Sequence, residues 1–121
     1  VSDASIAQLT FDALNNSVPP SVPGIVFLSG GMSEIQATNV LNQLNMLNNK
    51  SPWYLSFSYG RALQASVLKA WMGKPENIHL AQEQLLKRAK ANGLATLGKY
   101  EGEHILNENE QSSLHVENYS Y

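Results

Sequence analysis

The sequence predicts an α/β fold with parallel strands, because helix-like and strand-like segments alternate along its 121 residues. Two short apolar runs, residues 25–28 and 54–59, are typical of buried strands. Apolar residues at helical spacing indicate four helices, over residues 3–16, 33–47, 61–72 and 75–92. Two strands are too few for a complete parallel sheet, which needs cover on both faces and further strands at its edges. We therefore expect the chain to be part of a larger α/β protein.

The bulk composition describes one small domain with a modest core. The net charge is −2, which argues against a general surface for nucleic acids, although a local basic site stays possible. The sequence has no cysteine, so disulfides and thiolate metal sites are excluded. It has no apolar run near the roughly 18 residues of a membrane span, and no secretory leader. Since the first residue is Val1, either processing precedes it or the sequence belongs to something longer.

The first helix is predicted over residues 3–16, with Ser2 or Asp3 as its cap. Its apolar face is expected to contain Ile6, Leu9, Ala13 and Leu14. Prolines in residues 18–23 end this helix, because proline lacks a backbone N–H and disfavours a helical conformation in the residue before it.

A glycine turn follows the strand at residues 25–28. Ser29-Gly30-Gly31 turns the chain, and Ser33 opens the second helix with Gln36 at the capping-box position. A turn of this kind leaves backbone N–H groups pointing at one spot, which suits a phosphate or another anion. Ser29 adds a hydroxyl donor. The alternative is an ordinary strand-to-helix turn, and this stretch alone favours that alternative.

The other helices are delimited by turn residues. The second is expected to run to about Leu47, with its asparagines mostly outside the apolar face, and residues 48–52 form a loop. Met72-Gly73 closes the third helix, and Asn92-Gly93 stops the fourth. The cations Lys87, Arg88 and Lys90 then lie near the end of the fourth helix, as the helix dipole prefers. The expected apolar faces are Ala37, Val40, Leu41 and Leu44, then Leu63, Val67, Ala70 and Trp71, then Ile78, Ala81, Leu85 and Ala89.

The last part of the chain is predicted to be a tail. Residues 98–111 are polar, so we expect a domain at residues 1–97 and a mobile segment at residues 98–121. Residues 114–121 regain apolar and aromatic content, which indicates a terminus that docks elsewhere. The alternative is a frayed end with stray aromatic residues.

Both predicted strands end in the same way, with a hydroxyl residue and glycine before a helix. The two loops are Ser29-Gly30-Gly31 and Ser58-Tyr59-Gly60-Arg61. In a parallel sheet they lie at one edge, where two helix starts and an arginine fork make a phosphate clamp. In β/α barrels, phosphate sites are often built from the last two such loops. The alternative for Arg61 is a surface charge, which is weakened because a cation at a helix start opposes the helix dipole.

The remaining chemistry-bearing residues give weaker signals. The three histidines, His79, His104 and His115, show no metal-ligand spacing. No lysine falls at a strand end, where a nucleophilic lysine of a barrel is expected. The acids Asp3, Asp12, Glu34 and Glu76 are interpreted as helix-end or solvated groups, and Trp53 and Trp71 as core.

Two long motifs and two shorter features resemble the carboxy-terminal part of class I fructose-bisphosphate aldolases. The long motifs are Val18-Pro-Pro-Ser-Val-Pro-Gly-Ile-Val-Phe-Leu-Ser-Gly-Gly-Met-Ser-Glu34 and Trp53-Tyr-Leu-Ser-Phe-Ser-Tyr-Gly-Arg-Ala-Leu-Gln-Ala-Ser66. The shorter features are Lys87-Arg-Ala-Lys-Ala-Asn92 and the terminal Tyr121. The ending, residues 113–121, is similar to plant cytosolic forms.

The resemblance implies a TIM barrel, or (β/α)8 barrel, in which residues 25–28 and 54–59 form strands seven and eight. Family members cleave fructose 1,6-bisphosphate reversibly to dihydroxyacetone phosphate and glyceraldehyde 3-phosphate in glycolysis and gluconeogenesis. They use a lysine Schiff base and need no metal or other cofactor. They are usually cytoplasmic homotetramers, and the resemblance implies no nucleic-acid or membrane partner.

The resemblance also implies roles for individual residues. Those that would hold the C1 phosphate are Ser29, Gly30, Gly31, Ser58, Gly60 and Arg61. Tyr121 would be the catalytic tail tyrosine, which folds over the site, assists proton transfer and favours the bisphosphate substrate.

The sequence departs from the family pattern in several places. The Schiff-base lysine of the family belongs to strand six, upstream of residues 3–16, so an isolated chain is expected to be inactive. Met32 stands where glutamine is usual, Asn15-Asn16 replaces a basic pair, and residues 117–120 are unusual. The alternative function is a non-catalytic phosphate-binding or interaction module derived from an aldolase.

Overall fold

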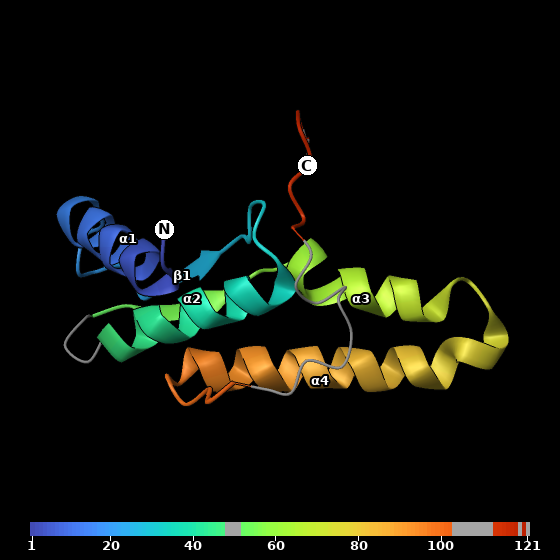
Figure 1. Cartoon of the computed structure of the whole chain (residues 1–121). Helices are drawn as coiled ribbons and strands as arrows, with labels where there is room; N and C mark the ends of the chain where they lie inside the picture. The colour runs from blue at the N-terminus through green and yellow to red at the C-terminus, as the bar shows by residue number, and fades with distance from the viewer. Residues whose placement is uncertain (48–51, 103–112, 119, 121) are drawn as a thin grey trace.

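The computed structural model describes residues 1–47, 52–102, 113–118 and 120. Within them, the chain is mixed α/β and mostly helical, as Figure 1 shows. The order of elements is α1 (Asp3–Ser17), β1 (Gly24–Phe27), α2 (Glu34–Leu47), β2 (Tyr54–Phe57), α3 (Arg61–Trp71), the short 3₁₀ helix η1 (Pro75–Asn77) and α4 (Ile78–Thr96). The predicted alternation of helices and strands is confirmed.

The two strands form a parallel pair, joined by the α2 crossover. Their register pairs Gly24 with Tyr54 and Phe27 with Phe57. The starts of α2 and α3 lie near the middle of Figure 1, the two helices run from there in opposite directions, and α4 lies along both. This arrangement brings the starts of two helices to one end of the sheet.

Sequence signals at the helix ends are largely confirmed. The Ser2 hydroxyl accepts a hydrogen bond from the Ser5 N–H at 3.1 Å and caps α1. Met72 and Gly73 take positive φ angles of 56° and 70° after α3, as expected of a helix stop. The predicted stop at Asn92-Gly93 is wrong, because α4 continues to Thr96. The glycine that follows the helix is Gly98, which takes a φ of +66°.

The core lies where α2 covers the strands. The predicted face of α2 is confirmed, since Ala37, Val40, Leu41 and Leu44 are all buried. Trp53 is also buried, and its indole N–H donates to the Pro19 carbonyl at 2.9 Å.

Other predicted apolar faces need correction. In α1 the buried residue is Ala7, whereas Leu9 is exposed. In α3, Ala62 and Ser66 are buried, whereas Trp71 is exposed, so the interpretation of Trp71 as core is wrong. In α4, Ile78 and Leu85 are exposed, and the buried residues are Ala81, Arg88, Ala91, Asn92 and Ala95. Helical periodicity located the helices, but it did not identify which polar residues turn inward.

Two asparagines of α2 belong to the interior. Asn42 is buried and exchanges hydrogen bonds with the backbone of Tyr100, at 2.9 and 3.1 Å. The Asn45 amide donates to the carbonyls of Leu41, Leu55 and Ala95. The prediction that these asparagines lie outside the packed face is therefore wrong for both. Packing also extends past residue 97, since Tyr100 is buried.

The exposed side of the strands is apolar. Val26 and Leu28 are 62% and 54% exposed, on the face of the sheet opposite to α2. Tyr54, at the start of β2, is 77% exposed. A parallel sheet is normally covered on both faces, so these side chains mark a surface that further structure would cover. Among the described helices, none is both long and apolar enough to span a membrane.

Candidate functional site

The parallel register brings the two predicted loops together. The Ser58 N–H donates to the Phe27 carbonyl at 2.8 Å and extends the pairing of the strands by one step. The chain therefore leaves both strands at the same edge and turns into α2 and α3. The prediction that the two loops lie side by side is confirmed.

The first loop is a tight turn that ends in a helix cap. Gly30 takes a φ of +59°, and the Met32 N–H donates to the Ser29 carbonyl at 3.2 Å. The Ser33 hydroxyl accepts from the Gln36 N–H at 3.1 Å, as the capping-box pattern predicts. The Gln36 amide does not complete the reciprocal bond there; it donates to Asp3 of α1 at 3.2 Å.

Arg61, the first residue of α3, spans the two loops. One terminal nitrogen of its guanidinium donates to the Gly30 carbonyl at 3.0 Å. The other donates to the Leu114 carbonyl. Gly60 precedes α3, and its carbonyl accepts from the N–H groups of Leu63 and Gln64. The guanidinium thus lies beside the Ser29–Gly31 turn, held there by two backbone carbonyls.

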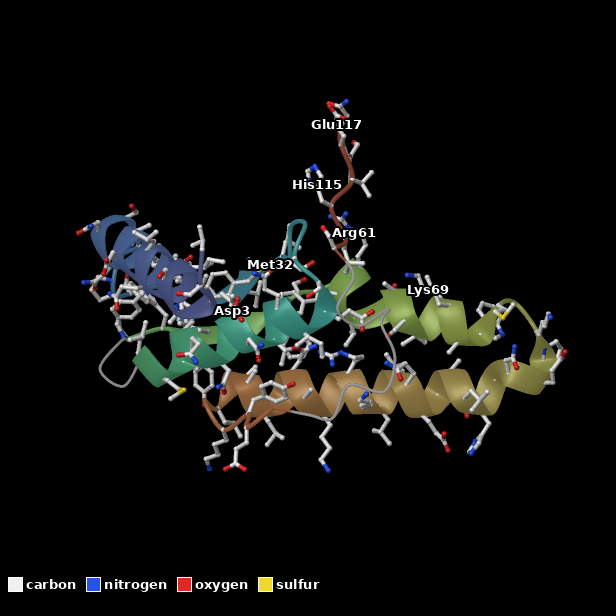
Figure 2. The ribbon with its side chains drawn as sticks, viewed as in Figure 1. Asp3, Met32, Arg61, Lys69, His115 and Glu117 are labelled. Carbon is white, nitrogen blue, oxygen red and sulfur yellow. The ribbon has the colours of Figure 1, made fainter. Side chains whose placement is uncertain are left out.

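Residues 113–116 lie against this site, as Figure 2 shows for His115 above Arg61 and Met32. The Gly31 carbonyl accepts from the Leu114 N–H at 3.1 Å and from the Ser113 hydroxyl at 3.0 Å. A groove of about 420 Å³ runs between this segment and the first turns of α3. The prediction that the end of the chain docks elsewhere is confirmed for these residues. Tyr121 and His104 lie outside the described residues.

Gly31 is needed for this contact because of its size. A Cβ atom at Gly31 would lie 2.7 Å from the Cβ of His115, closer than real Cβ contacts allow. By contrast, a Cβ at Gly60 would meet no atom within 4 Å. The glycine pair of the first loop therefore serves two purposes, a positive φ at Gly30 and close packing at Gly31.

Sequence reasoning missed a buried polar network beneath the loops. Glu34 and Arg88 are both completely buried, with the Arg88 Nε 3.3 Å from a Glu34 carboxylate oxygen. Glu34 is a helix-end acid, as expected, but it is buried and not solvated. Arg88 is not an exposed cation at the end of its helix, because it is buried before the last turn of α4. The available signal was the spacing of Gln84, Arg88 and Asn92, which places three polar residues on one stripe of α4.

Tyr59 is a structural residue beside the second loop. It is buried, and its hydroxyl donates to the Ala37 carbonyl at 2.9 Å. Burial raises the pKa of the Tyr59 phenol well above its ordinary value, so it is a neutral donor at physiological pH. Its ring also contacts Phe57, with centroids 5.5 Å apart. These contacts fix the backbone from which Gly60 and Arg61 extend.

The arrangement suits anion binding. It combines two helix starts, a serine hydroxyl and a guanidinium, which are the donors that recognise a phosphate. Within the described ranges, no group of three or more acidic or histidine side chains could hold a metal ion.

Comparison with known proteins gives a consistent result. The family model for class-I fructose-bisphosphate aldolase matches residues 1–121. The cytoplasmic aldolase isozyme of Cicer arietinum is 56% identical over 116 residues, 96% of this chain and 32% of the relative. An aldolase of Schistosoma mansoni is 62% identical over 96 residues, 79% of this chain and 26% of the relative.

A solved structure agrees with these sequences. The aldolase of Plasmodium falciparum, determined in complex with TRAP and a small-molecule inhibitor, superimposes with a TM-score of 0.82 at 54% identity. The match covers 85% of this chain and 29% of that one. The resemblance to plant cytosolic forms is confirmed by the plant relatives, and flatworm sequences match to a similar degree.

The chain spans about a third of the length of the curated relatives it matches. The sequence motifs, the parallel strand pair with its two loops, and the match along all 121 residues agree. The chain therefore belongs to the class I fructose-bisphosphate aldolase family.

Proposed function

We propose that this chain supplies the phosphate-binding part of an aldolase that cleaves fructose 1,6-bisphosphate in glycolysis and gluconeogenesis. In this proposal β1 and β2 are strands seven and eight of a (β/α)8 barrel, and residues 98–121 form its carboxy-terminal tail. The open, apolar side of Val26 and Leu28 supports the proposal, because a barrel would cover it. The plant relatives are named cytoplasmic or cytosolic isozymes, and we extend that location to this protein.

The observation that carries the proposal is the position of Arg61. Its guanidinium lies 3.0 Å from the Gly30 carbonyl, between two loops that end in helix starts. A phosphate at this point would accept from the guanidinium and from backbone N–H groups of the turn. The proposed contacts come from Ser29, Gly30, Gly31, Ser58, Gly60 and Arg61.

The covalent step belongs to residues outside this chain. The family resemblance assigns carbon–carbon cleavage to a Schiff-base lysine, and removal of such a nucleophile removes the covalent route altogether. We propose that Tyr121 assists proton transfer over the bound substrate, and that the complete enzyme is a homotetramer. The chain alone would bind phosphate without turnover.

The test uses a segment-replacement enzyme, the Cicer arietinum aldolase with its matching segment replaced by this chain. In this enzyme Arg61→Ala should raise the KM for fructose 1,6-bisphosphate. A charge-assisted fork to phosphate contributes about 1.5–3 kcal/mol, or roughly a tenfold to hundredfold change. Lys69→Ala, which removes a cation from the exposed side of the same helix, is the matched control. Unchanged kinetics for Arg61→Ala would mean that the phosphate binds elsewhere.

A further inference from the structure

A buried carboxylate links the two helices that follow the loops. Glu34 is the first residue of α2 and is fully buried. One of its carboxylate oxygens accepts from the Ser66 backbone N–H at 2.6 Å, and the other accepts from the Ser66 hydroxyl at 2.7 Å. Ser66 lies in α3, which begins with Arg61. The bond therefore joins the helix that follows the first loop to the helix that follows the second.

Arg88 of α4 balances the charge of this carboxylate. Its Nε lies 3.3 Å from Glu34, and a terminal nitrogen donates to the Glu34 carbonyl at 3.1 Å and to the Thr38 hydroxyl at 2.6 Å. Both ionic side chains are fully buried. A well-packed apolar pair of similar volume is often as stable as a buried ion pair, so stability alone does not explain these residues. What the Glu34 carboxylate supplies, and an apolar contact does not, is a pair of directional hydrogen bonds from Ser66 that hold α3 against α2.

The apolar contacts between these helix starts are small. The buried members of this cluster are Ala37, Ala62 and Tyr59, with Met32 and Leu63 packed against them, and apolar contacts of this kind have no preferred direction. A site for a single phosphate needs its donors held to within about 0.5 Å, which small apolar contacts do not guarantee.

We propose that Glu34 is a positioning residue for the phosphate site. Its bonds to Ser66 set the spacing between the Ser29–Gly31 turn and the start of α3. This spacing places the Arg61 guanidinium beside the Gly30 carbonyl, at 3.0 Å. The inference rests on the proposed function, since it assigns these residues to the same phosphate site.

The first variant is Ser66→Ala in the segment-replacement enzyme. It removes the hydroxyl that donates to Glu34 and accepts from the Gln84 amide of α4, and it keeps the Ser66 backbone N–H and the helix. We expect the KM for fructose 1,6-bisphosphate and the inhibition constant of inorganic phosphate to rise together, by roughly three- to tenfold. The effect should be smaller than for Arg61→Ala, because Ser66 acts on the site through Glu34 and its backbone N–H still bonds that carboxylate. The kcat should fall by less than about twofold, because bound substrate still meets the same chemistry.

The matched control is Asn45→Ala. Asn45 also joins elements through partly buried hydrogen bonds, to Leu55 of β2 and Ala95 of α4, but toward the other end of α2. It should lower the melting temperature and leave both phosphate constants unchanged. The second variant is Glu34→Asp, which keeps the charge beside Arg88 but is too short to reach Ser66 in the same way, and it should raise the same two constants.

The outcomes separate this inference from the proposed function. If the unmodified segment-replacement enzyme folds and does not cleave the bisphosphate, the proposed function is wrong. If it cleaves, and Ser66→Ala and Glu34→Asp raise the phosphate constants no more than Asn45→Ala does, the positioning role of Glu34 is wrong. A rise of both constants in either variant, absent in the control, supports it.

Discussion

At the scale of single residues, Gly31 determines how the end of the chain docks. Its carbonyl accepts two hydrogen bonds from Ser113 and Leu114, and the space over its Cα is filled by His115. Gly30 differs, because its φ of +59° requires glycine for conformation and no atom lies within 4 Å of a Cβ built there. The two adjacent glycines can therefore be distinguished experimentally.

Gly31→Ala should detach residues 113–116 from the first loop. The added methyl group would lie 2.7 Å from the Cβ of His115, and the tail segment can move away more easily than the turn can. Hydrogen exchange at the amide of Leu114, which donates to Gly31, should become faster in the segment-replacement enzyme. Gly60→Ala is the control, since a Cβ there meets nothing. Equal protection of Leu114 in both variants would contradict the contact.

Because Tyr59 is buried, the free energy of unfolding should depend on pH in the alkaline range. Burial raises the pKa of its phenol above the ordinary value of 10.0. The unfolded chain therefore loses this proton at a pH where the folded chain still holds it, so the unfolding free energy falls as the pH rises above about 10. Below that pH both states are protonated and the effect vanishes.

Tyr59→Phe should remove part of this alkaline loss. At neutral pH it should cost about 1 kcal/mol, because the Ala37 carbonyl loses its donor. The melting temperatures of the unmodified protein and of Tyr59→Phe, measured between pH 7 and 11, should converge as the pH rises. Parallel curves over that range would show that Tyr59 titrates like an exposed tyrosine.

At the scale of elements, α4 shows what pattern reading could and could not predict. Pro75 and the apolar residues predicted a long helix in the right place. The predicted core stripe failed because the inward face carries Arg88 and Asn92, and hydrophobic periodicity scores such residues as solvent-facing. Their partners, Glu34 and Thr38, lie more than 50 residues away in α2, so no local pattern records the pairing.

The loops were easier to predict than the helix faces. Strand-glycine-helix turns are local, so Ser29–Gly31 and Gly60–Arg61 could be placed from sequence alone, and the parallel pairing followed from the alternation of elements. The docking of residues 113–116 on Gly31 is a long-range contact. The apolar content of the last residues predicted that this segment docks, but no local pattern indicated where.

Arg88→Ala tests the buried pair at the element scale. It should destabilise the fold by about 3–5 kcal/mol, because the Glu34 carboxylate would remain buried beside an emptied space. Lys90→Ala, on the exposed side of the same helix, should have an effect within about 0.5 kcal/mol. Thermal unfolding of the segment-replacement enzyme measures both, and similar melting temperatures for the two variants would contradict burial of a charged pair.

At the scale of the whole molecule, the chain carries an unfinished sheet. A parallel pair of strands with exposed Val26, Leu28 and Tyr54 has the surface of an interior that other strands would complete. The match to about a third of each relative fits the same interpretation. Under the proposed function, this chain would bind and position the phosphate, and the nucleophile would come from the rest of the barrel.

The most direct test of the central claim is the cleavage of fructose 1,6-bisphosphate by the segment-replacement enzyme. Because 56% of the aligned residues are identical and both loops are present, we expect a kcat/KM within about tenfold of the Cicer arietinum parent, a difference of about 1.4 kcal/mol. This chain alone, treated with dihydroxyacetone phosphate and borohydride, should give no stable adduct. A segment-replacement enzyme that folds as the parent does but shows no measurable cleavage, or a stable adduct on the isolated chain, would contradict the account.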